Sequence, residues 1–224
     1  MTDGKHILVL GGGPDRERPV SFRSAACVAA ALREAGHRVT ESDITPGDLS
    51  ALNTRCDVIF PVLHGQWGEG GPLQRLLDQT GRPYVGSGYR ASRTAIDKLL
   101  AKQTAEKIGV PTPAAQQLGP TATLDLAPPV VLKPLTEGSS FDIYFCHTAD
   151  DVAAAREELH AHHAFILAER CVTGRELTVA ILDADPLPVI EIVPATDFYD
   201  YEAKYDRSDT QYRFEIDLPA ETMT

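Results

Sequence analysis

Long apolar runs are absent from this 224-residue sequence. The run in the N-terminal stretch MTDGKHILVLGGG is too short for a signal peptide, and no later run approaches the ~18 residues of a transmembrane helix. We therefore expect neither a secretory leader nor a membrane span, and we predict a cytoplasmic protein.

Cysteine is scarce as well, with four residues and no Cys-x-x-Cys pair. Without such a pair, neither a zinc ribbon nor a thioredoxin-type redox site is indicated. Reduced thiols in a cytosolic protein are the simpler interpretation. The cysteines are widely spaced, at Cys27, Cys56, Cys146 and Cys171.

Positive charge is also in short supply, because 21 Lys and Arg against 32 Asp and Glu give a net charge of −11. A nucleic-acid groove or a site for an anionic membrane surface needs a concentrated positive face, so we expect neither partner. Any anionic ligand must therefore be held locally.

The first half of the chain alternates strand and helix patterns. The stretches HILVL, RVTESDI, DVIFPVLHG and PYVGSG predict strands, and FRSAACVAAALREAGH and GPLQRLLDQTG predict helices. This alternation predicts an open, largely parallel α/β sheet. Its ligand edge is expected at the carboxyl ends of the strands, where the turns at Gly13, His64 and Gly86 would gather.

A long amphipathic helix over YRASRTAIDKLLAKQTAEKIGV follows, and then the pattern changes. The strand patterns VVLKP, SFDIYFCHT, FILAER and ELTVAILDADPLPVIEIVP with a helix over ADDVAAAREELHAHH predict an α+β unit of antiparallel strands around a helix. The predicted domain boundary lies near Asp97.

The stretch VLKPLTEGSSFD, residues 131–142, admits two interpretations. Glycine and serine between β-prone runs form ordinary hairpin turns. The same residues also form phosphate-covering loops, because Gly138 frees backbone N–H groups while Ser139 and Ser140 offer hydroxyls. From these residues alone the hairpin is favoured.

The glycine turn GGGPDR supplies two glycines of the dinucleotide-binding pattern GxGxxG, but it places Arg16 where close strand-to-helix packing needs glycine. A fitting acidic residue about 20 positions on is missing too, which disfavours a Rossmann oxidoreductase. We expect the N–H groups of this turn to face an anionic or carboxylate group. Glu17 and Arg18 are either substrate contacts or first-turn charges that complement the helix dipole.

Two histidine-containing stretches are ambiguous. His64 ends an apolar strand and is expected to face a cleft, with an ordinary loop histidine as an equal alternative. The stretch HAHH at 160–163 ends a charged helix without a nearby acidic or cysteine partner, which disfavours a metal site.

The stretch ILAERCVTGRELTV also admits two interpretations. Glu169 and Glu176 either flank a hairpin with solvated ends, turning at Thr173-Gly174, or contribute to an adenosine site. A carboxylate pairs well with a ribose diol, and Val172 offers an apolar wall for a base.

The segment DFYDYEAKYDRSDTQY, residues 197–212, is rich in tyrosine and charge and shows no clear periodicity. A long irregular segment inside a compact protein is usually a functional lid or a linker.

In this order, the stretches resemble the D-alanine:D-alanine ligases of the ATP-grasp superfamily. The matching stretches are ERPVS, LHGQWGEGG, YVGSG, AIDK, VVLKPLTEGSS, AERCVTGRELTVAIL and FYDYEAKY. The resemblance favours the phosphate loop over the bare hairpin for residues 136–140. It implies an α/β protein: an N-terminal open parallel α/β domain (1–97), a central α+β ATP-grasp domain (98–177) and the start of a C-terminal ATP-grasp domain with a lid loop (178–224).

The resemblance implies that ATP phosphorylates the carboxylate of one D-alanine and that the amine of a second attacks the acyl phosphate, a step of peptidoglycan precursor synthesis. A free carboxylate is a poor electrophile, so the protein must cradle the charge of a phosphate leaving group. By position, the resemblance implies a catalytic set of Glu17, Ser139 and Tyr205, a D-alanine site of Glu17, Val20 and His64, and an ATP site of Lys98, Lys133, Ser139, Ser140, Glu169, Arg170, Val172, Glu176 and Lys204.

Several positions depart from the family's pattern. Pro19 stands where another acidic residue is usual, Trp67 is unusual in the histidine loop, and SSFD replaces SSVG. Asp142 adds a negative charge and removes a glycine near the phosphates, changes expected to affect loop flexibility and nucleotide affinity. The chain also ends at Thr224, before the family's RxD and ExNxxPG segments. We therefore expect the Mg²⁺ or Mn²⁺ ligands to be missing and this chain alone to be inactive.

Two alternatives stay open. Pro19, Trp67 and Phe141-Asp142 would suit an ATP-grasp ligase for another amino or hydroxy acid, although Tyr205 favours D-alanine as the attacking group. The other alternative is a truncated, non-catalytic module that binds a nucleotide or an amino acid. The resemblance also implies a homodimer formed through the N-terminal domain.

Overall fold

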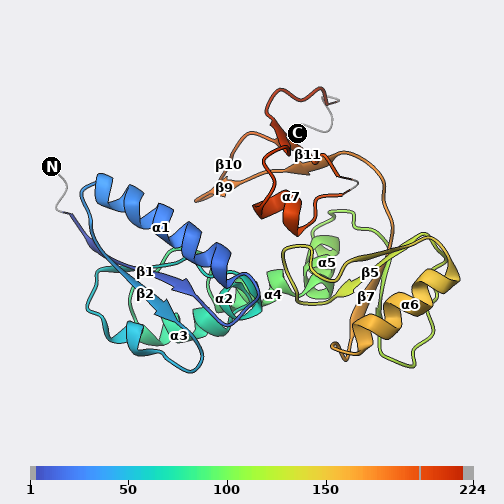
Figure 1. Cartoon of the computed structure of the whole chain (residues 1–224), viewed down its shortest axis with the longest axis horizontal. Coiled ribbons are helices and arrows are strands. Elements are labelled where there is room, and N and C mark those ends of the chain that lie inside the picture. The colour runs from blue at the N-terminus through green and yellow to red at the C-terminus, as the bar shows by residue number, and fades with distance from the viewer. Residues whose placement is uncertain (1–3, 197, 219–224) are drawn as a thin grey trace. The chain divides into compact units, whose positions relative to one another are not determined.

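The computed structural model describes residues 4–196 and 198–218, and the chain divides into two compact units. The first unit comprises residues 1–138 and 142–170, and the second comprises residues 139–141 and 171–224. Figure 1 follows the chain through its elements from blue to red. The division into domains at 1–97, 98–177 and 178–224 stays a prediction.

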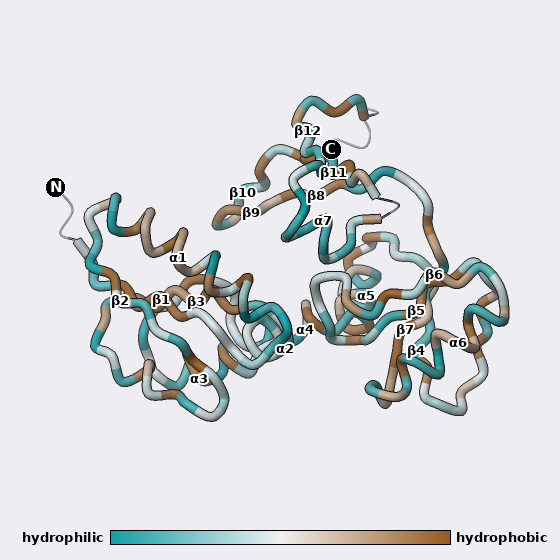
Figure 2. The backbone as a smooth tube through the Cα atoms, viewed as in Figure 1, coloured by the Kyte–Doolittle hydropathy of each residue, from teal (hydrophilic) through white to brown (hydrophobic). Residues whose placement is uncertain are grey.

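Three parallel strands in the order β2–β1–β3 form the first sheet of the first unit. Strand β1 (His6–Gly12) pairs over its whole length with β2 (Arg38–Ile44) and over part of it with β3 (Val58–Pro61). Figure 2 shows hydrophobic residues recurring along β1 and β3. The parallel sheet confirms the predicted α/β architecture.

Strand β1 is buried on both faces, because helices cover each side of it. Leu8 and Leu10 pack in one cluster with side chains of α3 (Pro72–Thr80), whereas Ile7 and Val9 pack in another with side chains of α1 (Arg18–Glu34). Alternate residues of a strand point to opposite faces, which accounts for this division. The other elements of this half are η1 (Ser50–Asn53), α2 (Gly65–Glu69), α4 (Tyr89–Ile96) and α5 (Lys98–Lys107).

The strand predicted for PYVGSG is wrong. Tyr84 forms only an isolated parallel bridge to Ile59, and Gly86 then takes a φ of 108°, which ends the extended path.

The single long helix predicted for residues 89–110 is also wrong, because the helix is interrupted at Asp97, between α4 and α5. Asp97 is extended (φ −84°, ψ 105°), and its carboxylate accepts from the N–H groups of Leu99 and Leu100, both at 3.1 Å. An aspartate in this position starts a new helix.

An antiparallel sheet in the order β4–β7–β5–β6 forms the rest of the first unit. Its strands are β4 (Ala115–Leu118), β5 (Val130–Pro134), β6 (Tyr144–Cys146) and β7 (Ile166–Arg170). Helix α6 (Ala149–His160) packs Val152, Ala155 and Leu159 against the buried residues of this sheet. Antiparallel strands around a helix are therefore confirmed, and so is the hairpin, since β5 and β6 are paired neighbours.

The second unit contains a sheet in the order β12–β11–β8 and a small hairpin of β9 and β10. Its elements are β8 (Glu176–Thr178), β9 (Ile181–Leu182), β10 (Asp185–Pro186), β11 (Ile190–Val193), α7 (Tyr201–Tyr205) and β12 (Gln211–Arg213). Strands β7 and β8 belong to different sheets, so the hairpin interpretation of the Thr173-Gly174 stretch is wrong. The segment predicted to be irregular contains the short helix α7, and its first residue, 197, lies outside the described residues.

Helix α6 begins with a reciprocal pair of hydrogen bonds. The Thr148 hydroxyl accepts from the N–H of Asp151 at 3.1 Å, and the Asp151 carboxylate accepts from the N–H of Thr148 at 2.9 Å. Hydrogen bonding of the Asp151 carboxylate by the Thr148 side chain, and by the backbone N–H groups of Thr148 and His147, lowers the pKa of Asp151.

No helix in the described part of the chain is long and apolar enough to span a bilayer.

We predict that Thr148→Ala lowers the free energy of unfolding by about 1 kcal/mol, because the variant leaves a helix N–H without its cap. Urea denaturation of the intact chain measures this loss. Thr121→Ala, at an exposed loop position, is the matched control. Equal losses in both variants would show that the cap does not stabilise the helix.

Candidate active site

One carboxylate joins two lysines in the first unit. Glu169 on β7 accepts from Lys133 Nζ on β5 at 2.9 Å and from Lys102 Nζ on α5 at 2.7 Å. The β5–β7 register pairs Val131 with Glu169. Lys133 lies two residues after Val131 on β5, so its side chain is on the same face of the sheet as that of Glu169 and diagonal to it. Burial raises the pKa of Glu169, but the hydrogen bonds from the two lysines outweigh it and hold the pKa below its ordinary value.

Sequence reasoning missed Lys102, although one signal was available. Lys98 and Lys102 are four residues apart, and such residues lie on one face of a helix. Lys102 is only 9% exposed.

Lys98 connects α5 to the loop that follows β5. Its Nζ donates to the carbonyl oxygens of Pro134 at 2.8 Å and Glu137 at 2.6 Å. Burial, together with the charge of Lys133, lowers the pKa of Lys98 to about 8. Three lysines thus lie around the Glu169 carboxylate in a chain whose net charge is −11.

The predicted phosphate loop has an unusual backbone. Ser139, Ser140 and Asp142 have φ values of 51°, 61° and 54°, in the left-handed region that non-glycine residues rarely adopt. Such residues cost about 1–3 kcal/mol each and persist only where neighbouring contacts hold them.

Hydrogen bonds within the second unit hold Ser139 and Ser140 in this backbone conformation. Ser139 Oγ and Tyr205 Oη are hydrogen-bonded at 3.1 Å. Ser140 Oγ donates to the carbonyl oxygen of Tyr199 at 2.9 Å and accepts from Lys204 Nζ at 2.6 Å. Burial lowers the pKa of Lys204. Four predicted site residues of this unit thus take part in contacts between the loop and the tyrosine-rich segment: Ser139, Ser140, Lys204 and Tyr205.

Two positions that depart from the family's pattern follow these serines. Phe141, in the second unit, stacks on Tyr201 with ring centroids 4.8 Å apart. Asp142, in the first unit, pairs with Arg16 at 3.2 Å and lies 3.9 Å from His163 Nε2. The charge that Asp142 adds is therefore paired, although Arg16 is 58% exposed and such pairs are weak.

Glu17 is the N-cap residue of α1 and is only 2% exposed. Within the described residues, no hydrogen-bond donor reaches its Oε1. A buried carboxylate oxygen without a partner is costly, so the site favours a cationic ligand. Glu17 is thus enclosed, whereas Arg18 hydrogen-bonds Asp43 and its side chain is 38% exposed. The substrate contact and the helix-dipole charge both stay predictions for these two residues.

His64 and Val20 also lie in the first unit. His64 Nδ1 lies 3.1 Å from Glu69 Oε1, and its Nε2 is buried without a partner among the described residues. The hydrogen bond with Glu69 raises the pKa of His64, and the charge of Glu17 adds to this effect. Val20 is buried at 5% exposure.

Two N–H groups of the glycine turn bond within the protein, so the expectation that the turn's N–H groups face an anionic or carboxylate group is wrong for Gly12 and Gly13. The Gly12 N–H donates to Ser21 Oγ at 2.9 Å, and the Gly13 N–H donates to the Ile44 carbonyl at 3.0 Å. Both glycines have φ near 89°, which accounts for glycine here.

The other two unusual positions have local structural partners. Pro19 lies in the first turn of α1, where proline fits because the N–H it lacks would have no helical partner. Trp67 packs against the leucine-rich cluster of the first sheet, and its backbone N–H donates to Asp15 Oδ2 at 2.9 Å.

The residues predicted to bind adenosine differ in their surroundings. Glu169 is largely buried, while Arg170 at the end of β7 is exposed. Val172 is 68% exposed and Glu176 is exposed at the start of β8. The first two belong to the first unit and the last two to the second, and their shared role stays a prediction.

A metal site is not evident in the described residues, where no three His, Cys, Asp or Glu side chains are grouped to hold an ion. In the HAHH stretch, His160 Nδ1 bonds the carbonyl of His163 at 2.9 Å. The Mg²⁺ or Mn²⁺ ion stays a prediction.

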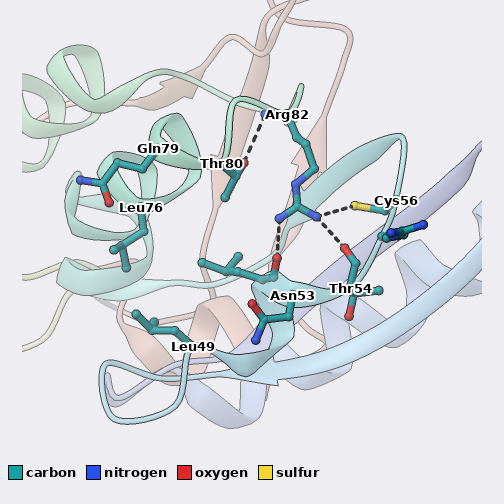
Figure 3. Close-up of a pocket in the computed structure, with 10 residues that line it drawn as sticks. Leu49, Asn53, Thr54, Cys56, Leu76, Gln79, Thr80 and Arg82 are labelled. Carbon is teal, nitrogen blue, oxygen red and sulfur yellow. Dashed lines mark hydrogen bonds between the residues drawn. The ribbon is translucent and has the colours of Figure 1, made fainter.

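A surface cavity of about 630 Å³ lies elsewhere in the first unit, beside η1 and the end of α3. Arg82 lines it and donates to the carbonyls of Leu52 and Thr54, both at 2.6 Å, and to Cys56 Sγ at 3.3 Å. Figure 3 shows Arg82 with Thr54 and Cys56. The Arg82 guanidinium thus donates its hydrogen bonds to acceptors of the protein itself. None of the predicted site residues lines this cavity.

Comparison with known proteins identifies the family. Residues 40–87 match the family described as D-ala D-ala ligase N-terminus, and residues 114–224 match D-ala D-ala ligase C-terminus. The D-alanine–D-alanine ligase of Methylacidiphilum infernorum is 38% identical over 208 residues, covering 93% of this chain and 68% of the relative. That of Hydrogenovibrio crunogenus is 40% identical over 212 residues, covering 92% of this chain and 68% of the relative.

Solved structures agree with the sequence relatives. The D-alanine–D-alanine ligase from Bacillus anthracis superposes with a TM-score of 0.81 at 30% identity, covering 97% of this chain and 74% of that chain. Its complex with ATP gives a TM-score of 0.80 at 26% identity, covering 98% and 73%. The fold is therefore the ATP-grasp fold of these enzymes, and this chain belongs to the D-alanine–D-alanine ligase family.

Proposed function

We propose that this protein is an ATP-dependent carboxylate–amine ligase that joins two D-alanine molecules through an acyl phosphate, for peptidoglycan precursor synthesis. One observation carries the proposal: Gly138 of the loop lies beside Glu17, since a Cβ on Gly138 would stand 3.5 Å from Glu17 Oε1. An α-amino acid held by its ammonium at Glu17 presents its carboxylate only a few ångströms away. The group to be phosphorylated then lies near the loop.

The D-alanine site of the proposal uses two buried polar atoms. Glu17 Oε1 binds the ammonium of the first D-alanine, and His64 Nε2 offers a further polar contact. The Val20 side chain supplies an apolar wall for the methyl group. A cationic ligand removes the cost of leaving the Glu17 carboxylate buried and unpaired.

The ATP site of the proposal depends on lysines, which act as point charges for phosphate. Lys98 and Lys133 bind the phosphates from the first unit, while Ser139, Ser140 and Lys204 cover them. Glu169, Arg170, Val172 and Glu176 surround the adenosine. ATP supplies the phosphoryl group. Among the described residues, no group of His, Cys, Asp or Glu side chains is placed to bind a metal ion, so the proposal names no metal ligands.

We further propose, from the family resemblance, that Glu17, Ser139 and Tyr205 act as one catalytic set. The Ser139–Tyr205 hydrogen bond at 3.1 Å supports the part of this set that lies in the second unit. A lid closed over the acyl phosphate excludes the water that would hydrolyse it. Because the reaction consumes ATP, we place it in the cytoplasm; the homodimer through residues 1–97 stays a prediction.

We predict that ADP release by the protein as its gene encodes it depends on D-alanine. A coupled assay with ATP, magnesium and a panel of D-amino acids, L-amino acids and D-lactate measures this dependence. Equal or faster turnover with another acid would move the assignment to an ATP-grasp ligase of different substrate. Nucleotide binding without turnover on any acid would favour a binding module.

We predict that Lys133→Ala and Glu17→Ala lose different ligands. Loss of a charged hydrogen bond costs about 1.5–3 kcal/mol, so Lys133→Ala should weaken a non-hydrolysable ATP analogue roughly ten-fold or more. Glu17→Ala should leave the analogue bound within about two-fold and weaken D-alanine instead. Calorimetric titration of both ligands decides, and a Glu17→Ala variant that loses the analogue as badly would contradict the assignment.

We predict that the affinity for the ATP analogue falls as the pH rises through about 8, the pKa of Lys98. Phosphate favours the protonated lysine, so binding raises this pKa and takes up a proton near pH 8. Calorimetry in buffers of different ionisation enthalpy counts that proton. Lys98→Arg, which stays charged, should bind without the uptake; uptake unchanged in this variant would assign the proton to another group.

A further inference from the structure

Lys102 is the member of the lysine cluster to which the proposed function gives no role. It is 9% exposed, on α5, and its Nζ donates to Glu169 Oε2 at 2.7 Å. A lysine is rarely buried to this degree unless it is paired. The pairing is uneven, because Glu169 also accepts from Lys133 at 2.9 Å through its other oxygen.

The charges of this group decide what Lys133 can offer to a ligand. Glu169 carries one negative charge, and the ammonium groups of Lys102 and Lys133 carry two positive charges between them. With Lys102 present, the group retains one positive charge. Without Lys102, the charges of Glu169 and Lys133 cancel, and the positive charge that an arriving phosphate meets falls to that of Lys98 alone.

The low exposure of the group makes this balance matter. The side chains of Lys102, Glu169 and Lys133 are 10%, 15% and 19% exposed, so solvent screens their mutual attraction only in part. A phosphate that approaches Lys133 also approaches the Glu169 carboxylate. The repulsion between these two anions has to be offset by a cation that the phosphate itself does not use.

We propose that Lys102 is a positioning residue of the nucleotide site: it neutralises Glu169 and holds its Oε2, which leaves the charge of Lys133 available to a nucleotide phosphate. This inference rests on the proposed function, because it assumes that Lys133 meets a phosphate. Lys102 itself touches no ligand in this arrangement. It acts through Glu169, so its effect should disappear when Glu169 loses its charge.

The test is a double-mutant cycle read by calorimetric titration with a non-hydrolysable ATP analogue. Lys102→Met keeps the length of the side chain and removes the charge, and we expect it to weaken the analogue roughly ten-fold or more. In the Glu169→Gln background the same change should cost about two-fold at most, because no carboxylate is left to neutralise. D-alanine affinity should change by less than about two-fold in Lys102→Met, since the carboxylate of Glu17 is untouched.

Two further variants separate charge from packing. Lys107→Met, at an exposed position of the same helix, is the matched control and should bind the analogue as the unmodified protein does. Lys102→Arg keeps the charge and should retain affinity within about three-fold. Thermal unfolding of each variant reports stability independently, and Lys102→Arg keeps the cycle informative if Lys102→Met unfolds.

Three outcomes would overturn the inference: unchanged affinity in Lys102→Met, an equal loss with and without the Glu169 carboxylate, or a loss in Lys102→Arg as large as that in Lys102→Met. The second would show that Lys102 acts by packing or by direct attraction. If the unmodified protein does not bind the analogue at all, the proposed function fails and this inference fails with it. If it binds and only the Lys102 series departs from expectation, the inference alone is wrong.

Discussion

The buried carboxylate of Glu169 is the group around which the candidate site is arranged. Its two oxygens hold lysines from two elements far apart in sequence, Lys102 on α5 and Lys133 on β5. The Glu169 side chain is 15% exposed, and removing it would leave two lysines without their shared counter-charge. The same interaction therefore ties a helix to the antiparallel sheet and concentrates positive charge locally in an acidic protein.

The loop after β5 depends on a second constraint, the support of left-handed residues by side chains. Ser139 and Ser140 are held by hydrogen bonds within the second unit, and Asp142 is held by Arg16 within the first. Phe141 adds a stacked ring at a position where the family's pattern has a smaller residue. Phe141 and Asp142 thus each make a specific contact at positions where the family's pattern has valine and glycine.

Strands predicted from apolar runs in the sequence are present in the structure. The parallel strand β1 and the antiparallel strands β5 and β7 follow from their apolar runs. The patterns fail where one residue stops an element that the periodicity would continue: the Asp97 carboxylate caps a new helix inside an apparently continuous one, and Gly86, with φ 108°, ends a strand after one bridge. Lys102 was missed because its partner, Glu169, stands 67 positions away in the sequence.

Burial is the property that the sequence conveyed least, and it decides the chemistry of the first turn. Glu17 and Arg18 are adjacent and equally polar, yet only Glu17 is enclosed, with an oxygen that no described donor reaches. The Gly12 and Gly13 N–H groups beside it bond to the protein's own oxygens. This turn therefore offers a negative charge where a dinucleotide-binding turn offers N–H donors to phosphate. The proposed function places an ammonium at Glu17 and phosphates at the lysines, the separation that an amino acid and a nucleotide require.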